Sequence, residues 1–440
     1  MRTSKPLRLA MVSMHTSPAD TPGSGDAGGM NVVELHQAEA LAALGHQVEI
    51  ITRRSDPSQP DVMPLGRGVT LRHLTAGPQE RLAKSAIDQY IGEFSEAMAE
   101  LDPYDLVHSH HWMSGVAALP QARAWGVPHV QSYHSVAARV GDQLSEGEPP
   151  ESPNRVAGEA MLARESDLVV AISAAEARTV VERCGADPSR VAICPPGVDT
   201  DLFRPRATGE PKWTWPHNVG PACAKGYVLF AARLQPLKGP DLAIAALSHV
   251  PVDLRPHLVM AGEVSQDFAA YADELHAQVE RLGLQDYVTF VGPQPRAKLA
   301  EMLRGALFSL VPSHSETFGL IALESAASGT PVIASAAGGL REAVVHGESG
   351  QLMDSRQPSD WGSAMIRLLA DPDLLARMGV VARIHARRYS WQAAADCLTG
   401  LYEKLLDNAD GELTQPLDPE AFWSAAEFDG DHQHDRGAAQ

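Results

Sequence analysis

Short apolar runs alternate with amphipathic stretches along most of the chain, and the alternation comes in two series. In the first series, apolar runs predict strands at Leu7 to Met14, Val48 to Thr52, Asp105 to His108, Val127 to Tyr133 and Leu168 to Ser173. Amphipathic stretches between them predict helices at Val32 to Leu44, Ala83 to Leu101, Gly115 to Trp125, Arg155 to Glu165 and Ala174 to Cys184. Strands and helices that alternate at this spacing are typical of a parallel, doubly wound sheet.

A second series begins after a stretch with poor periodicity. Its apolar runs predict strands at Tyr227 to Ala232, His257 to Ala261, Val288 to Val291, Phe308 to Val311 and Pro331 to Ala334. The predicted helices are Asp241 to Leu247, Ala269 to Arg281, Lys298 to Leu303, Gly319 to Ser328 and Trp361 to Leu369. We therefore expect an α/β protein with two Rossmann-like, doubly wound domains that face each other across a cleft.

These patterns also predict the domain boundaries. The expected units are an N-terminal domain (1–203), a linker (204–226), a C-terminal domain (227–388), a last helix (389–407) and an acidic tail (408–440). The last helix is amphipathic and has the N-terminal domain as its candidate partner. The tail has the composition of a disordered segment.

Composition narrows the function classes. The 440 residues are 44% hydrophobic, and 55 acidic against 36 basic residues give a net charge of −19, which argues against nonspecific binding to nucleic acid or to an anionic membrane. The four cysteines have neither metal-site spacing nor a disulfide framework, and no apolar run approaches the length of a membrane span. A cytoplasmic protein is expected.

Two carboxylates, Glu316 and Glu324, lie eight residues apart across a glycine. The residues before them predict a strand end, Ser313 to Phe318 predict a loop, and Gly319 onward predicts a helix; this is the edge of an α/β sheet where ligands bind. Two acceptor groups there suit two hydroxyl-bearing moieties and indicate a nucleotide-sugar site. The alternative is a solvent-facing Glu324 and a Glu316 that only complements the helix dipole.

Two cations, Arg233 and Lys238, lie in the turn between the next domain's first strand and helix. Fixed positive charge at a helix N-terminus stabilises a diphosphate leaving group as it gains negative charge. The alternative is a surface pair that flanks the helix. Arg296 and Gly338-Gly339 lie at two further strand ends of the same sheet edge.

The loop after the first strand carries the pattern G-x-G-x-x-G from Gly23 to Gly28. Together with Arg53-Arg54 it suggests an NADP-dependent oxidoreductase. The spacing argues against this alternative, because about eight residues separate Met14 from the first glycine. What remains is Gly28-Gly29 at a helix start, where the backbone can approach an anion or a sugar closely; a surface loop is the other interpretation.

Three neighbouring histidines, His108, His110 and His111, lie at the end of a predicted strand. No acidic or cysteine partner lies at metal-site spacing, so contact with a ligand or a hydrogen bond in the core is favoured over a metal site. The next strand ends at His134 and Ser135, at the same sheet edge.

The combination of Arg233 with Lys238, of Glu316 with Glu324, and of a Gly-Gly loop after the first strand resembles the retaining glycosyltransferases of family 4, which have the GT-B fold. The similarity spans roughly residues 7 to 405. Within that family, three segments look most like the mycothiol-pathway members, which move N-acetylglucosamine from UDP-GlcNAc to 1D-myo-inositol 3-phosphate: Met14 to Pro18, Gly25 to Asn31 and His108 to Gly115.

On the donor side, this resemblance implies that Arg233 and Lys238 clamp the UDP diphosphate. Glu324 would bind the ribose and Glu316 the donor sugar. The remaining implied donor residues are Gly29 against the donor, Arg296 near the uridine and His134 near the sugar. The implied catalytic residues are His134, Arg233, Lys238 and Glu316.

On the acceptor side, the resemblance places Lys84, His111, Ser135 and Arg155 around the inositol phosphate. It places the following residues against the inositol ring: His15, Asp26, Ala27, Gly28, Gly29, Met30 and Asn31. Taken alone, Lys84 and Arg155 would be ordinary surface charges. The family has Tyr at position 111 and Thr at position 135, but the histidine and the serine found here can also donate to a phosphate.

The implied reaction proceeds with retention on the front face of the sugar, where the departing diphosphate helps to take the acceptor proton. Arg233 and Lys238 can replace a metal, so no cofactor is required, and Mg²⁺ is left open. The rival functions are a sibling transferase of the sucrose-phosphate-synthase type, an NADP oxidoreductase, and a nucleotide-sugar-binding protein without turnover. We expect small-molecule substrates and neither nucleic-acid nor integral membrane partners, and we leave a homodimer open.

Overall fold

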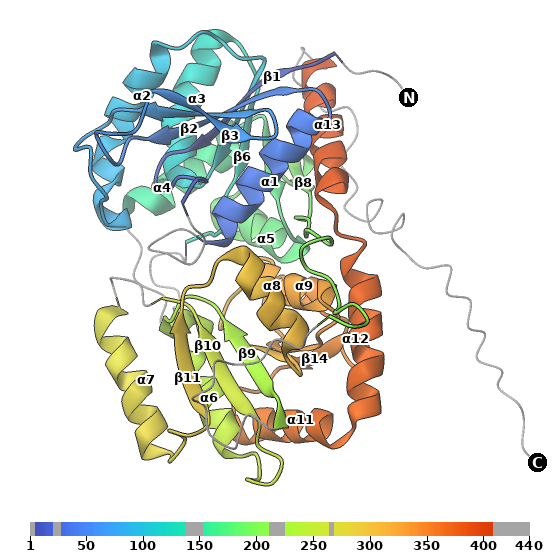
Figure 1. The fold of residues 1–440 in the computed structure, drawn as a ribbon. Helices are drawn as coiled ribbons and strands as arrows, with labels where there is room; N and C mark the ends of the chain where they lie inside the picture. Colours follow the sequence, from blue (N-terminus) through green and yellow to red (C-terminus); the bar gives the residue numbers. More distant parts are fainter. Residues whose placement is uncertain (1–4, 21–27, 138–152, 211–224, 264–267, 408–440) are drawn as a thin grey trace, which may run out of the picture.

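The molecule has two lobes stacked one above the other, each built on a twisted sheet covered by helices (Figure 1). The structure is a computed structural model that describes residues 5–20, 28–137, 153–210, 225–263 and 268–407. Three sequence predictions lie outside the described residues: the contacts of Asp26 and Ala27, most of the linker, and the disordered tail.

The first sheet, in the described part of the chain, has eight strands in the order β3-β4-β2-β1-β5-β6-β7-β8. All neighbours pair in parallel except β3 and β4, which form an antiparallel pair. The strands are β1 (Arg8–Ser13), β2 (Gln47–Arg53), β3 (Val62–Gly66), β4 (Val69–Leu74), β5 (Leu106–His110), β6 (His129–Ser132), β7 (Leu168–Ala171) and β8 (Val191–Ile193).

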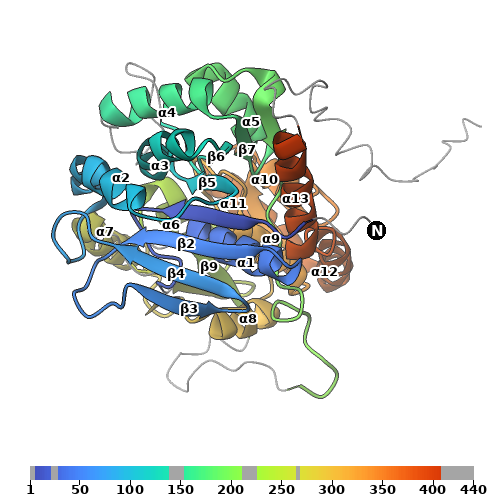
Figure 2. The same cartoon turned by 90° about the horizontal axis from the view of Figure 1, so that it is seen from above.

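Helices cover both faces of this sheet (Figure 2). They are α1 (Gly29–Ala43), α2 (Ile91–Ala99), α3 (Trp112–Trp125), α4 (Pro153–Glu165) and α5 (Ala174–Thr179), which continues as a π-helical turn at Val180–Cys184. Because side chains alternate along a strand, Leu9 and Met11 pack on the α1 side, whereas Ala10 and Val12 pack in the core beneath α2 and α3.

The second sheet has six parallel strands in the order β11-β10-β9-β12-β13-β14 among the described residues. The strands are β9 (Tyr227–Ala231), β10 (His257–Ala261), β11 (Val288–Gly292), β12 (Ser309–Val311), β13 (Val332–Ser335) and β14 (Gly350–Met353). The helices are α6 (Pro240–Ser248), α7 (Ala269–Arg281), α8 (Arg296–Gly305), α9 (Leu320–Ala327), α10 (Leu340–Ala343), α11 (Pro358–Ala370) and α12 (Pro372–Ala386). The strand order reverses between β9 and β12, and ligands bind at such a reversal.

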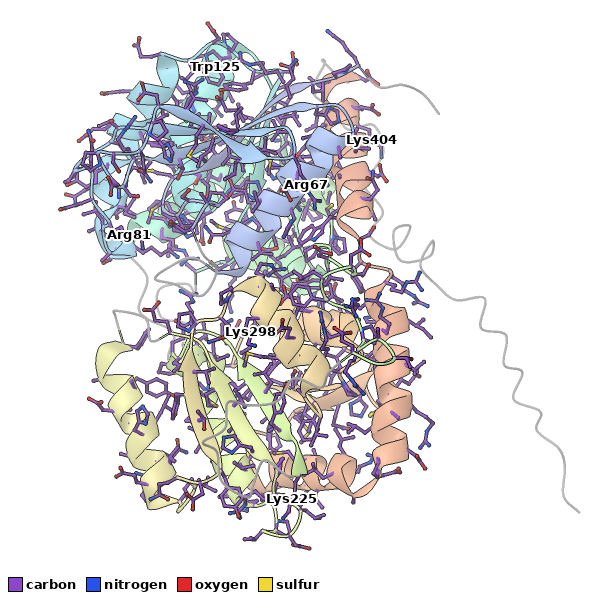
Figure 3. All side chains as sticks on the ribbon, in the orientation of Figure 1. Arg67, Arg81, Trp125, Lys225, Lys298 and Lys404 are labelled. Carbon is purple, nitrogen blue, oxygen red and sulfur yellow. The ribbon has the colours of Figure 1, made fainter. Side chains whose placement is uncertain are left out.

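These two sheets confirm the expected fold class of two Rossmann-like domains. Side chains fill the space between each sheet and its helices (Figure 3). Every strand predicted from the sequence is present, with ends that differ by at most two residues. The predicted helices at Ala269–Arg281 and Gly319 to Ser328 correspond to α7 and α9.

One predicted helix is wrong in its first half. The segment expected to be helical from Ala83 to Leu101 begins with two short 3₁₀ turns, Lys84–Ala86 and Asp88–Tyr90, and the α-helix starts only at Ile91. From Lys84 to Tyr90 only Ile87 is buried, so there is too little apolar surface to hold a longer helix.

The last helix, α13 (Trp391–Asp407), follows α12 of the C-terminal lobe and packs against α1 and the first sheet of the N-terminal lobe (Figure 1). Its buried residues are Ala394, Ala395, Leu398, Leu401 and Tyr402. The Tyr402 hydroxyl also lies 2.6 Å from His108 Nδ1 on β5. Helix α13 therefore returns to the N-terminal lobe and packs against the sheet in which the chain begins.

Candidate functional site

A cleft of about 520 Å³ separates the two lobes, and both lobes contribute to its walls. The N-terminal lobe contributes the loop after β1, the start of α1, the ends of β5 and β6, and α5. The C-terminal lobe contributes the ends of β9, β10 and β11, the loop after β12, and α9. The carboxyl ends of both parallel sheets thus meet at one cavity, as expected for a ligand site.

The donor-side carboxylate Glu316 forms an ion pair with Lys238. Lys238 Nζ lies 2.7 Å from Glu316 Oε1, and the Ser313 hydroxyl donates to the same oxygen over 2.9 Å. Lys238 ends a 3₁₀ turn that follows β9, and Gly239 closes this turn with a φ of 65°. A Cβ at Gly239 would lie 2.3 Å from the carbonyl oxygen of Pro312, so the turn can pack against the end of β12 only with glycine there.

The second carboxylate, Glu324, pairs with Arg296 over 2.8 Å and is only 5% exposed. The alternative of a solvent-facing Glu324 is therefore wrong. Arg296 begins α8, and its guanidinium lies over the Phe203 ring, 4.9 Å from the centroid. Arg233 lines the same cleft beside these groups.

The glycine loop forms the opposite wall. Asn31 is buried and ties the loop to the start of α1: Gly28 N–H donates to Asn31 Oδ1 over 2.9 Å, and Asn31 Nδ2 donates to Thr16 Oγ1 and to the Ser17 carbonyl. A Cβ added at Gly29 would lie 3.4 Å from Leu320 Cδ1 at the start of α9. The N-termini of α1 and α9 therefore approach each other across the cleft, and both favour a negatively charged ligand.

His134 is held in an unusual backbone conformation, with a φ of 59°. Its carbonyl oxygen accepts a hydrogen bond from Thr317 Oγ1 of the other lobe, and its Nε2 lies 2.8 Å from His110 Nδ1. Burial lowers the pKa of His134 to about 4, so its imidazole is neutral at pH 7.

The proposed acceptor residues gather on the N-terminal side of the cleft. The His15 and His111 rings lie 4.1 Å apart, and burial, followed by the charge of Lys84, lowers the pKa of each. Met30, Lys84 and Ser135 also line the cavity.

Arg155 stands behind this wall rather than in it. It is buried and pairs with Glu159 over 2.8 Å, and its Nη2 donates to the Ser135 carbonyl and hydroxyl oxygens over 3.0 Å. Its position therefore makes it a support for Ser135, one layer from the cavity.

The structure adds a residue that the sequence reasoning missed. Glu176 on α5 lines the cleft, accepts from Ile172 N–H over 2.7 Å, and has a pKa raised by burial to about 7. The available signal was Ser173-x-x-Glu176, the pattern of a helix N-terminus, and Ser173 Oγ does accept from Glu176 N–H.

A second residue outside the sequence predictions is Glu342 of the C-terminal lobe. Its carboxylate accepts from the Ala174 N–H at the start of α5 over 2.9 Å. Together with Thr317, it joins the two lobes.

The NADP interpretation of Arg53-Arg54 is wrong. Arg53 donates to the carbonyl oxygens of Pro78 and Glu80, each over 2.7 Å, and Arg54 pairs with Asp61. Both guanidiniums are buried and fasten the loops around β2 instead of facing a nucleotide.

The described residues contain neither a cluster of three or more His, Cys, Asp or Glu arranged for a metal ion nor a helix long and apolar enough to span a membrane.

Comparison with known proteins gives the family. Residues 28–197 match the "Glycosyl transferase 4-like domain", and residues 212–385 match "Glycosyl transferases group 1". The D-inositol 3-phosphate glycosyltransferase of Thermobispora bispora is 41% identical over 411 residues, which cover 91% of this chain and 95% of that protein. The enzyme of the same name from Thermomonospora curvata is 42% identical over 418 residues, covering 92% and 96%.

Among solved structures, sucrose-phosphate synthase from Thermosynechococcus elongatus superposes with a TM-score of 0.82 at 29% identity, over 91% of this chain and 99% of that one. The chain therefore has the GT-B fold and belongs to the glycosyltransferase family that includes the D-inositol 3-phosphate glycosyltransferases.

Proposed function

We propose that this enzyme transfers N-acetylglucosamine, with retention, from UDP-GlcNAc to 1D-myo-inositol 3-phosphate, the reaction of mycothiol biosynthesis. The observation that carries the proposal is the pair of ion pairs in the cleft, Lys238 with Glu316 and Arg296 with Glu324, opposite the glycine loop. Relatives about 40% identical over nearly the whole chain support the acceptor.

Each ion pair leaves one carboxylate oxygen for the donor. Among the described contacts, both bonds to Glu316 reach Oε1, and Arg296 also reaches Oε1 of Glu324. The two Oε2 atoms are then available to accept from hydroxyl groups. In the proposed complex, Glu316 takes hydroxyls of the sugar, Glu324 takes the ribose, and Arg296 lies near the uracil, with Gly29 against the donor from the opposite wall.

The cations act on the leaving group. When the bond between the anomeric carbon and the diphosphate oxygen breaks, negative charge grows on the UDP β-phosphate. Lys238 carries three N–H donors, so it can keep its bond to Glu316 and still donate to that phosphate beside Arg233. Because both charges are in position before the reaction, they stabilise the transition state with little reorganisation.

The acceptor hydroxyl then forms its bond to the anomeric carbon on the face that UDP leaves, and its proton passes to the departing diphosphate oxygen. His134 lies beside the sugar in this proposal. Lys84, Ser135 and His111 meet the inositol phosphate, supported from behind by Arg155, and His15 meets the inositol ring.

The diphosphate charge is assigned here to Arg233 and Lys238, so the proposed reaction requires no metal. Transfer measured in EDTA and in Mg²⁺ tests this part. We also propose that the enzyme works in the cytoplasm, because the four cysteines of the sequence are scattered without the spacing of a disulfide framework.

The test of the function is UDP release with UDP-GlcNAc in the presence of different acceptors. We expect release that depends on inositol 3-phosphate and that is at least tenfold slower with inositol, since one charge-assisted recognition site is worth about 1.4 kcal/mol or more. Fructose 6-phosphate keeps a phosphate but lacks the inositol ring, and it should also be a poorer acceptor. Release that prefers fructose 6-phosphate would assign the sucrose-phosphate-synthase type instead. Binding of UDP-GlcNAc without release for any acceptor would assign a binding protein.

A further inference from the structure

Three imidazoles form a column that runs from the core of the N-terminal lobe to the cleft. His108 and His110 are two residues apart on β5 and therefore lie on the same face of the sheet, and their rings stack with centroids 4.5 Å apart. The His110 ring stacks in turn on His134, at 5.0 Å and an interplanar angle of 18°. Of the three, only His134 lines the cleft.

The buried end of the column has a defined proton arrangement. The Ser132 hydroxyl donates its single hydrogen to the Val170 carbonyl over 2.9 Å, so Ser132 Oγ must accept from His108 Nε2–H, also over 2.9 Å. His108 Nδ1 is then a lone pair that accepts from the Tyr402 hydroxyl of α13 over 2.6 Å. His108 is thus neutral, with its proton on Nε2.

The cleft end of the column has two candidate arrangements. His110 Nδ1 and His134 Nε2 are 2.8 Å apart, and both rings are kept neutral by burial, so one nitrogen donates and the other accepts. The second nitrogen of each ring, His110 Nε2 and His134 Nδ1, has no hydrogen-bond partner among the described residues. One of these two nitrogens carries a proton, and the other has a lone pair that accepts no hydrogen bond.

The two arrangements differ in where the unsatisfied N–H is placed. Both nitrogens are shielded from solvent, but of the two residues only His134 lines the cavity, so a ligand oxygen can approach the His134 ring and not the His110 ring. A buried N–H without an acceptor is costlier and rarer than an unfilled lone pair. The arrangement that leaves the lone pair on His110 and the N–H on His134 is therefore favoured.

We propose that His110 is a positioning residue: its Nδ1–H donates to His134 Nε2 and so fixes His134 as the Nδ1–H tautomer, a hydrogen-bond donor to an oxygen of the bound nucleotide sugar. The identity of the ligand rests on the proposed function; the tautomer does not. The backbone of His134 is held by its carbonyl bond to Thr317 and by the bond of its N–H to Glu176. Among the described residues, the hydrogen bond of the His134 ring is the one to His110, and we assign the direction of the ring to it.

The first test reads the tautomer directly from the ¹⁵N shifts of the imidazoles in histidine-labelled enzyme, with the signals of His134 assigned by loss in His134→Gln. We expect a protonated Nδ1 and an unprotonated Nε2 on His134 at pH 7. In His110→Phe, which keeps the ring stack but loses the hydrogen bond, we expect the His134 tautomer to change or become mixed. In His110→Asn, whose amide can donate from about the Nδ1 position, we expect it to be retained.

The matched control is His129→Phe. His129 is equally buried on the adjacent strand and bonds Ser109 and Ser166 instead of His134. The His129→Phe substitution should lower the stability by about as much as His110→Phe and leave the His134 signals unchanged. A protonated Nε2 on His134 in the unmodified enzyme overturns the proposal, and so does an unchanged tautomer in a folded His110→Phe. If that variant does not fold, the unmodified enzyme and His110→Asn decide alone.

The second test is kinetic. We expect His110→Phe to raise the KM for UDP-GlcNAc and lower kcat/KM by about tenfold to a hundredfold, as for a lost hydrogen bond to a buried polar ligand. His110→Asn should recover most of this, and His129→Phe should lose less than about threefold. Equal losses in His110→Phe and His129→Phe would reduce His110 to a structural residue. If no variant or unmodified enzyme transfers sugar, the proposed function fails while the tautomer result stands.

Discussion

Thr317 of the C-terminal lobe donates a hydrogen bond from Oγ1 to the backbone carbonyl oxygen of His134 in the N-terminal lobe, over 2.7 Å. The donor follows Glu316 directly in the chain, and the acceptor is the residue with the strained φ of 59° at the end of β6. This contact thus joins the segment that carries Glu316 to a histidine of the other lobe, and both residues are assigned to the donor sugar. We therefore expect this hydrogen bond to hold the two lobes in the arrangement that places both groups against the donor.

We predict that Thr317→Val lowers kcat/KM about twofold to tenfold, because a single hydrogen bond contributes roughly 0.5–1.5 kcal/mol and this one joins the two lobes at the cleft. Thermal stability should change little, because the bond joins two separately packed cores. Thr289→Val is the control, since Thr289 bonds His257 at the far edge of the second sheet. Equal kinetic losses in Thr317→Val and Thr289→Val would show that the hydrogen bond from Thr317 has no specific effect on activity.

Lys238→Ala should reduce kcat by about a hundredfold to a thousandfold, the usual loss when one preorganised group that stabilises transition-state charge is removed. The matched control is Lys298→Ala on α8 (Figure 3): this lysine is about 43% exposed, pairs with Glu301, and does not line the cleft. Its variant should keep full activity. An unchanged kcat in a folded Lys238→Ala would contradict the assignment of Lys238 to the leaving group.

Glu324→Gln should act on binding more than on chemistry. The carboxylate is assigned to the ribose, far from the bond that breaks, so we expect the KM for UDP-GlcNAc to rise about tenfold with little change in kcat. Donors that lack a ribose hydroxyl provide the check. The unmodified enzyme should bind them more weakly than UDP-GlcNAc, whereas Glu324→Gln should bind both kinds of donor with nearly equal affinity. If Glu324→Gln and the unmodified enzyme prefer UDP-GlcNAc over these donors by the same factor, a group other than Glu324 binds the ribose.

Glu34 on α1 gives a prediction about stability and pH. It is fully buried, neither carboxylate oxygen has a hydrogen-bond partner among the described residues, and the neighbouring Ser13 hydroxyl donates to the Thr16 carbonyl instead. Burial raises the pKa of Glu34 from 4.5 to about 8. In the folded enzyme it therefore stays protonated at pH values where the unfolded chain has already lost the proton.

The direction in which stability changes with pH follows from this difference in pKa. The folded state is favoured most below pH 4.5, and the free energy of unfolding falls as the pH rises from 4.5 to about 8, by about 1.4 kcal/mol for each pKa unit. Glu34→Gln carries no such ionisation, so its melting temperature relative to the unmodified enzyme should rise steadily between pH 5 and pH 8. A constant difference across that range would show that Glu34 has an ordinary pKa.

Much of the donor half could be predicted from the sequence, because its signals are local. Buried apolar runs mark β9 and β12; Arg233 and Lys238 follow β9 by two and seven residues, and Glu316 follows β12 by five. Their pairing as Lys238 with Glu316 and Arg296 with Glu324 could not be predicted, since each ion pair joins segments that only the folded sheet brings together.

The features that the sequence did not predict also depend on contacts between segments that are distant in the chain. The role of His110 depends on a hydrogen bond to His134 on the neighbouring strand, and the place of Arg155 behind Ser135 depends on its pairing with Glu159. Local signals were overlooked as well. The edge strand β3 and its neighbour β4 alternate exposed and half-buried or buried residues. Asp371 precedes α12 and caps it, because its side chain accepts from Leu374 N–H.

The most direct test of the central claim is the product formed from UDP-GlcNAc and 1D-myo-inositol 3-phosphate, analysed by mass spectrometry and by the anomeric proton coupling in NMR. We predict one phosphorylated conjugate of N-acetylglucosamine and inositol, with the α configuration of the donor retained, formed in equal amount to the UDP released. A β-configured product, or free N-acetylglucosamine in place of the conjugate, would contradict a retaining transferase that acts on this acceptor.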